Sequence, residues 1–188
     1  RYLSLIEALR IPTVVLETRV ELGLDKDISV PIPCIVSDYC GGAREGVECL
    51  IELGHQRIAY ISGTESSQSR LRMEGYREAL RYHNIPLRSD YVLKGNWSWS
   101  SGYDCACRAM QLSDPPTALF AANDNMAMGS MCALKERGYA IPEDISILGF
   151  DDIPAAQRSR PPLTTVRQQT KTMVSQAIDL LIRARDGE

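Results

Sequence analysis

The chain has 188 residues, of which 44% are hydrophobic and 24% charged, and its net charge is −3. This balance is typical of a globular domain, and the weak negative charge argues against a surface that itself binds nucleic acid. The longest apolar runs, such as residues 118–122, are far too short to cross a membrane. The six cysteines include no Cys-x-x-Cys pair, and the chain has only two histidines. We therefore expect reduced cysteines that act as small apolar residues, with no metal or cofactor.

Strand and helix patterns alternate along the chain. The expected strands lie at residues 13–16, 34–36, 57–61, 91–93, 117–121, 145–148 and 164–166. Apolar spacing predicts helices at residues 3–9, 38–53, 70–82, 100–112, 124–137 and 171–185. Gly54 and Gly138 follow two of these helices and are expected to cap them. Apolar strands separated by helices predict an α/β fold with a parallel sheet covered on both faces, and the early first helix suggests a fragment of a longer protein.

Polar side chains follow the carboxyl end of almost every expected strand. They are Glu17, Asp38, Ser62, Asn96, Asn123, Asp124, Asp151, Asp152 and Gln168, joined by the aromatic Trp97. In open parallel sheets, ligands collect at this edge. Amides and carboxylates can pair with sugar hydroxyls, and an aromatic face can pack on the C–H side of a pyranose ring. The sequence therefore predicts a cleft for a polar, sugar-like ligand.

Some of these side chains have a structural alternative. Asp124 opens a helix, so an N-cap role is favoured over ligand contact, whereas Asn123 has no obvious structural task. One of Asp151 and Asp152 could simply fix its loop through its own backbone. Arg72 would be a solvated arginine by default, yet a guanidinium near a helix start could bridge two sugar hydroxyls. These alternatives remain open at the level of sequence.

The sequence signatures of common enzymes are missing. Residues 41–46 (GGAREG) do not form the dinucleotide-binding glycine pattern, and neither a phosphate-binding Gly-Lys-Ser/Thr loop nor a Gly-x-Ser-x-Gly elbow occurs. His55 and His83 lie at helix ends, which makes a Ser-His-Asp triad improbable. Asp151 and Asp152 are adjacent and would point apart, unlike the paired carboxylates of a glycosidase. We expect no catalytic residues and no enzyme activity.

Five blocks of sequence follow one another along the chain: LGHQRIA at 53–59, RMEGY at 72–76, AANDNMAMG at 121–129, PEDISILGFDDI at 142–153 and RPPLTTV at 160–166. In this order they strongly resemble the effector-binding domain of the lactose-repressor (LacI/GalR) family of transcription regulators. One block would be weak, but five in sequence are highly specific. The segment from Val20 to Pro33 is not distinctive, and the DNA-binding headpiece of such regulators is absent from this chain.

The resemblance implies a periplasmic-binding-protein-like fold of two Rossmann-like lobes, with the effector in the cleft between them. Crossovers between the lobes would fall near Gly54–His55 and Thr164–Gln168. The implied division is a partial N-terminal lobe at residues 1–54 plus 168–188 and a C-terminal lobe at residues 55–167.

Position by position, the resemblance also implies functional residues. Arg72, Asn123 and Asp151 match the sugar-contacting arginine, asparagine and aspartate of the family, and Trp97 matches an aromatic pocket residue of some members. Further candidates for ligand contact are Asp38, Gln68, Asp124 and Gln168. A homodimer is expected through the apolar face and adjoining loop that contain Met128, Met131, Cys132 and Ile153.

The leading hypothesis is the sensor domain of a bacterial, cytoplasmic transcription regulator, expected to be a repressor. Its effector would be a sugar-like small molecule, and operator DNA would be bound through the headpiece, with no membrane partner. The alternative is a periplasmic sugar-binding protein of a transport system, which shares the two-lobed fold. Six cysteines without evident pairing favour the regulator, because the periplasm is oxidising. A sugar-metabolising enzyme is a third reading, which turnover would reveal.

Overall fold

A computed structural model describes residues 11–17 and 32–186. The chain divides into two compact units, a smaller one of Arg1–Asp38 with Gln169–Glu188 and a larger one of Tyr39–Gln168. The division corrects the predicted crossover near Gly54–His55, because the helix before that point packs within the larger unit. The boundary falls at Asp38–Tyr39 instead.

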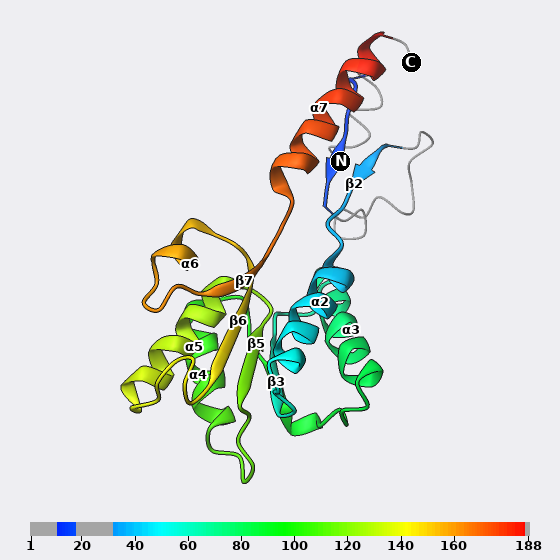
Figure 1. Ribbon diagram of the computed structural model, residues 1–188. Coiled ribbons are helices and arrows are strands. Elements are labelled where there is room, and N and C mark those ends of the chain that lie inside the picture. Colours follow the sequence, from blue (N-terminus) through cyan, green and yellow to red (C-terminus); the bar gives the residue numbers. More distant parts are fainter. Residues whose placement is uncertain (1–10, 18–31, 187–188) are drawn as a thin grey trace. The chain divides into compact units, whose positions relative to one another are not determined.

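In its described residues, the smaller unit contains a two-stranded parallel sheet and one long helix. Its elements are β1 (Val15–Leu16), β2 (Cys34–Ile35) and α7 (Thr170–Asp186) (Figure 1). Val15 and Ile32 are buried at the sheet, and Met173 and Ala177 are buried on the helix. The helix predicted at residues 3–9 lies outside the described residues.

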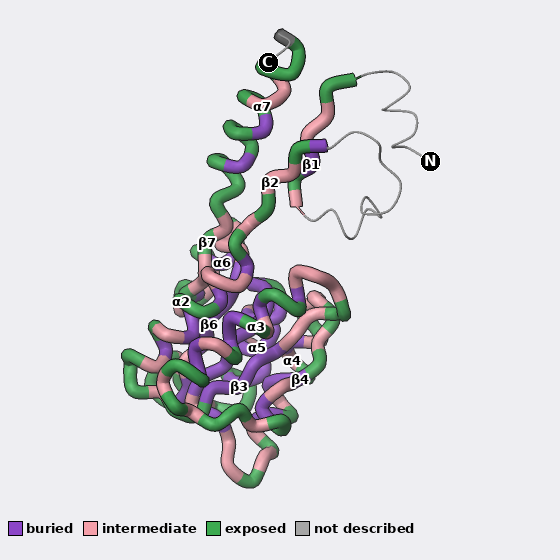
Figure 2. Tube along the Cα trace, turned by 90° about the vertical axis from the view of Figure 1, so that its right-hand side faces the viewer, coloured by how far each residue is buried: buried purple, intermediate pink, exposed green. Residues whose placement is uncertain are grey.

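The larger unit is built on a five-stranded sheet in the order β4-β3-β5-β6-β7, with every neighbouring pair parallel. Its strands are β3 (Ile58–Ser62), β4 (Val92–Lys94), β5 (Ala118–Ala121), β6 (Ser146–Asp151) and β7 (Thr164–Arg167). All four residues of β5 and the first four of β3 are buried, as continuously apolar strands require. Buried residues accordingly run through the middle of the sheet (Figure 2). The predicted parallel α/β fold is confirmed.

Helices cover both faces of this sheet. The pair α2 (Tyr39–Glu52) and α3 (Ser67–Tyr82) packs on one face, and the pair α4 (Trp99–Ala109) and α5 (Asp124–Glu136) packs on the other (Figure 1). The short segments η2 (Ser89–Tyr91) and α6 (Pro154–Arg158) were not predicted, because three to five residues are too few to show helical periodicity. Helix α3 begins earlier than expected, since Ser66 accepts a hydrogen bond from the Ser69 N–H and caps it.

Gly46 of the segment GGAREG allows α2 to pack closely on the sheet. A Cβ on Gly46 would lie 2.8 Å from the Val166 side chain and 2.9 Å from that of Leu148, so a larger residue would push α2 off β6 and β7. The predicted caps also form, because Gly54 (φ +95°) and Gly138 (φ +82°) adopt the left-handed conformation after α2 and α5.

His55 joins the ends of β5 and β6 at the edge of the sheet away from the polar loops. Its Nδ1 lies 2.9 Å from the Thr117 hydroxyl, and its Nε2 lies 2.9 Å from the Ser146 hydroxyl. Burial lowers the pKa of His55 below its ordinary value of about 6.5. Burial therefore favours the neutral form of the imidazole in the folded protein.

This histidine gives the stability a defined pH dependence. Because the unfolded chain takes up the proton at higher pH than the folded chain, the contribution of His55 is complete above about pH 6.5 and is lost as the pH falls through the lowered folded pKa. We expect His55→Gln to flatten the fall of the unfolding free energy as the pH drops below about 6.5, measured by urea denaturation. An unchanged slope in His55→Gln would contradict the assignment.

Candidate functional site at the carboxyl edge of the sheet

The strand order creates a topological switch point in the larger unit. After β3 the chain adds β4 on one side and then β5 on the other, so the connections leaving β3 and β5 diverge. Ligands of open α/β sheets bind in the crevice at such a point. Ser62 and Gly63 end β3 here, and Asn123 follows β5. The polar residues identified in the sequence thus reach the same edge.

Arg72 is the centre of this edge and is only 3% exposed. Its guanidinium carbon lies 4.4 Å from the ring centroid of Tyr39 and 4.3 Å from that of Phe150. Its Nη2 lies 3.3 Å from Oδ1 of Asp151, and the Gln168 amide donates to the same oxygen at 2.5 Å. We call Arg72, Asp151 and Gln168 the arginine centre. The default expectation of a solvated arginine is wrong.

Burying the Arg72 guanidinium costs free energy, and the groups that surround it fix its orientation. A charge taken out of water needs a carboxylate and aromatic faces to offset its lost hydration. Tyr39 and Phe150 fix the plane of the Arg72 guanidinium, and Asp151 fixes its rotation. Neither ring is evident from the sequence, since Tyr39 enters from the start of α2 and Phe150 reads as an ordinary strand residue. A rigid, planar donor beside aromatic rings suits a ligand rich in hydroxyl groups.

Trp97 forms the other wall of the candidate site. Its ring lies 5.5 Å from the Arg72 guanidinium carbon, and its indole N–H donates to the Thr64 hydroxyl at 2.8 Å. The ring lies flat against Gly63, where an added Cβ would be 2.0 Å from the indole. Only glycine therefore leaves room for the Trp97 ring at position 63. This steric requirement is not evident from the sequence alone.

Substituting Gly63 tests this placement of Trp97. We expect Gly63→Ala to displace the indole and break its bond to Thr64, at a cost of roughly 1–3 kcal/mol of unfolding free energy. In a Trp99→Phe background, the fluorescence of Trp97 should shift to longer wavelength as the ring becomes more solvated. Thr64→Val is the milder control, because it removes the hydrogen bond but leaves the ring in place. An unshifted emission spectrum in Gly63→Ala would refute the stacking.

Asn123 and Asp124 have roles opposite to those expected. The Asn123 side chain caps α5 by accepting from the Met126 N–H at 2.9 Å, and its amide nitrogen donates to the Trp97 carbonyl at 3.0 Å. Asp124 is the first residue of the helix and is fully buried, accepting from the Ile153 N–H and the Thr165 hydroxyl. Burial raises its pKa. The predicted N-cap role of Asp124 is therefore wrong, and this carboxylate links α5 to β7 without facing the site.

The backbone is strained at the same edge. Trp97 (φ +71°), Asp151 (φ +114°) and Asp152 (φ +59°) all have positive φ angles although none is glycine. Such residues cost about 1–3 kcal/mol each and persist only where the surrounding contacts over-determine them. Asp152 forms an ion pair with the exposed Arg167, so the two aspartates point to different partners as expected. Strain concentrated beside Arg72 supports a binding role for this edge.

The remaining sequence candidates are spread more widely. Gln68 is half-buried in the first turn of α3, and Gln168 joins the arginine centre. Asp38 belongs to the smaller unit and is exposed there. Of the residues predicted at a dimer interface, Met128, Cys132 and Ile153 are partly exposed, whereas Met131 is 4% exposed and packs in the core. Met131 is thus removed from the candidate dimer face.

Three further chemical features bear on function. All six cysteines are free thiols. Within residues 11–17 and 32–186, no cluster of His, Cys, Asp and Glu could hold a metal ion. Among those same residues, no helix combines the length and apolar character that a membrane crossing requires.

Known proteins match this chain in sequence and in structure. Residues 47–188 match the periplasmic binding protein-like domain family. A probable transcriptional repressor, ExuR of Bacillus subtilis, is 43% identical over 77% of this chain and 44% of its own length. The lactose operon repressor of Escherichia coli is 36% identical over 89% of this chain and 46% of its own length. The chain thus spans about half the length of the curated relatives it matches.

The solved structures agree with these relatives. A sugar-binding transcriptional regulator of the LacI family from Escherichia coli superposes with a TM-score of 0.85 at 35% identity, covering 98% of this chain and 64% of the other. These relatives are transcriptional regulators and not enzymes. With the parallel fold and the five sequence blocks, the matches show that this chain belongs to the LacI/GalR regulators, as their periplasmic-binding-protein-like effector-binding domain.

Proposed function

We propose that this chain is the ligand-sensing part of a transcriptional repressor whose effector is a sugar-like small molecule. The observation that carries the proposal is the arginine centre, a buried Arg72 held between Tyr39 and Phe150 and paired with Asp151. A protein maintains such a costly arrangement at a sheet edge when the group has a ligand to recognise. Ligand hydroxyls can accept from the guanidinium and donate to the carboxylate, and the Trp97 face can pack on ring C–H groups.

The residues proposed for ligand contact differ in their burial and in the bonds they already form. Arg72, Asp151 and Trp97 remain the leading candidates, with Gln168 now beside them through its bond to Asp151. Asn123 is 8% exposed and is occupied as a helix cap, so we propose that it positions the Trp97 loop and contacts ligand through its remaining edge. Asp124 is withdrawn from ligand contact because it is fully buried.

Operator binding and dimerisation are further parts of the proposal. The operator would be bound by a headpiece outside this sequence, in a cytoplasmic homodimer with no enzyme activity. The helix pair α4 and α5 exposes Trp99, 44% accessible and stacked on Tyr103, beside the partly exposed Met128 and Cys132. An exposed aromatic pair next to apolar side chains suits a subunit interface. Sedimentation of the full-length protein should give a dimer, and Trp99→Glu with Met128→Glu should give a monomer.

The transport-protein alternative is less supported. The relatives in sequence are repressors, and six free thiols suit a reducing compartment.

The effector class can be tested by thermal shift. Full-length protein is melted with glucose, galactose and lactose and, as a competing class, with adenine and uracil. We expect at least one sugar at 100 times its Kd to stabilise the protein by about 2.7 kcal/mol, with no shift from the nucleobases. A shift from a nucleobase alone would contradict a sugar-like effector, and chemical conversion of any sugar would contradict the absence of enzyme activity.

A further inference from the structure

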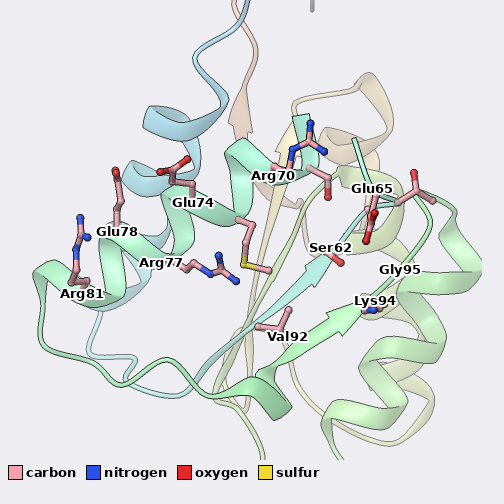
Figure 3. A pocket seen from close by; sticks show the side chains of 14 residues that line it. Ser62, Glu65, Arg70, Glu74, Arg77, Glu78, Arg81, Val92, Lys94 and Gly95 are labelled. Carbon is pink, nitrogen blue, oxygen red and sulfur yellow. The ribbon is translucent and has the colours of Figure 1, made fainter. Parts of the chain in front are cut away.

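A second hollow lies beside α3, away from the arginine centre. It is a groove with a volume of about 760 Å³, lined by α3, by residues 62–65 after β3 and by β4 (Figure 3). This volume is within the range of sites that bind small molecules. Neither Arg72 nor Asp151 lines it. We call it the α3–β4 groove.

The groove arises from the way in which two helices cover five strands. On this face α2 contacts β6 and β7, and α3 contacts β3. The edge strand β4 contacts α4, which belongs to the helix pair on the opposite face. Among the described elements, none is left to cover β4 on the α3 side. The side chains of β4 that face α3 therefore border an open space.

The lining of this space combines apolar side chains with charged ones, in which four cations (Arg70, Arg77, Arg81 and Lys94) outnumber three carboxylates (Glu65, Glu74 and Glu78). Val92 and Lys94 are two residues apart on β4 and so point to the same face. Met73 and Arg77 are four residues apart on α3 and lie on one side of that helix. Figure 3 shows Arg77 extending from α3 into the groove toward Val92. Glu74 and Glu78 also line the groove, and Figure 3 draws them on the side of α3 away from Val92; a Glu78 carboxylate oxygen accepts from the Cys40 thiol of α2 at 3.7 Å.

Two cations, Arg77 on α3 and Lys94 on β4, line facing walls of the groove. Within residues 11–17 and 32–186, neither the Arg77 nor the Lys94 side chain takes part in a hydrogen bond or an ion pair. Like charges on facing walls of one groove repel, and the low-dielectric floor of Met73 and Val92 concentrates their field. An anion placed between the walls would relieve this repulsion and bond to both cations.

We propose that the α3–β4 groove binds a small organic anion, a phosphate or carboxylate carried on a partly apolar body. Arg77 and Lys94 hold the anionic group, and Met73 and Val92 contact the body. The Ser62 and Thr64 hydroxyls close the end of the groove nearest the sheet edge and can bond to further polar groups of the ligand. Because Thr64 also holds the Trp97 indole, a ligand here touches a wall of the candidate sugar site. The proposal does not depend on the effector being a sugar.

Phenyl phosphate is a suitable probe because it joins a phosphate to an apolar ring. We expect it to bind the full-length protein in calorimetric titration, with phenol and inorganic phosphate each binding at least tenfold more weakly. Arg77→Gln and Lys94→Gln should each lower the affinity for phenyl phosphate by about tenfold, which is the usual effect of losing one charged hydrogen bond.

Two variants serve as controls. Arg81→Gln removes a cation that lines the groove but turns outward from α3, and it should bind phenyl phosphate as the wild type does (Figure 3). Asp151→Asn alters the arginine centre and should also leave this binding unchanged, which separates the two sites. The proposal is overturned if phenyl phosphate does not bind, if Arg77→Gln and Lys94→Gln bind it as tightly as wild type, or if Arg81→Gln weakens it equally.

Discussion

Asp151→Asn is expected to lower the free energy of unfolding by about 2 kcal/mol, because it removes the carboxylate that offsets a buried guanidinium. Arg72 is 3% exposed and the Asp151 side chain 27% exposed, so the loss falls below that of a fully buried pair. Asparagine keeps the size of the side chain and tolerates the positive φ of this position. The substitution therefore removes the charge of the side chain and little else. Urea denaturation at neutral pH measures the resulting change in the free energy of unfolding.

Asp152→Asn is a closely matched control. It lies next in the chain, also has a positive φ, and also loses an ion pair. Its partner Arg167 is 69% exposed, so solvent screens the interaction and the expected loss is below about 1 kcal/mol. Equal losses in the two variants would show that the Arg72 pair is no stronger than a surface contact.

The largest loss of stability is expected from Gly102→Ala, at about 3 kcal/mol. Helices α4 and α5 approach so closely that a Cβ on Gly102 would lie 2.0 Å from the carbonyl oxygen of Met126. The obstacle is backbone, which cannot rotate aside as a side chain can. The two helices must therefore move apart, and the Ser130 hydroxyl would lose its 3.0 Å bond to the Gly102 carbonyl.

Gly138→Ala is the control for the conformational cost of replacing a glycine by alanine. Nothing lies within 4 Å of a Cβ at that position, but the φ of +82° disfavours alanine, so the expected cost is about 1 kcal/mol. Denaturant titration of both variants should therefore separate steric from conformational cost. A loss in Gly102→Ala no larger than that in Gly138→Ala would contradict the close contact of α4 with α5. Since these helices carry the proposed dimer face, Gly102→Ala should also weaken dimerisation of the full-length protein.

The sheet and its main helices could be predicted from the sequence because their signals are local. A run such as Ala118–Ala121 is apolar throughout, and the caps at Gly54 and Gly138 mark helix ends. The short helix Pro154–Arg158 has no such signal. The unit boundary at Asp38 could not be read from local pattern, because it depends on which strands α2 packs against.

Only part of the candidate site could be predicted from the sequence. Arg72 and Asp151 were identified by type and position, yet their burial between Tyr39 and Phe150 depends on contacts distant in sequence. Asparagine and aspartate are equally good N-caps, so adjacent Asn123 and Asp124 could not be told apart without backbone angles. The α3–β4 groove likewise follows from the number of helices on one face, which no motif reports.

The most direct test of the central claim is calorimetric titration of the full-length protein with the sugar that gives the largest thermal shift among glucose, galactose and lactose. Removing a charged hydrogen-bond partner typically costs about 1.5–3 kcal/mol. Asp151→Asn should therefore weaken the binding of that sugar more than tenfold, while Asp152→Asn should bind it as tightly as the wild type does. Equal affinity in wild type and Asp151→Asn, with both proteins folded, would contradict the assignment of the arginine centre as the effector site.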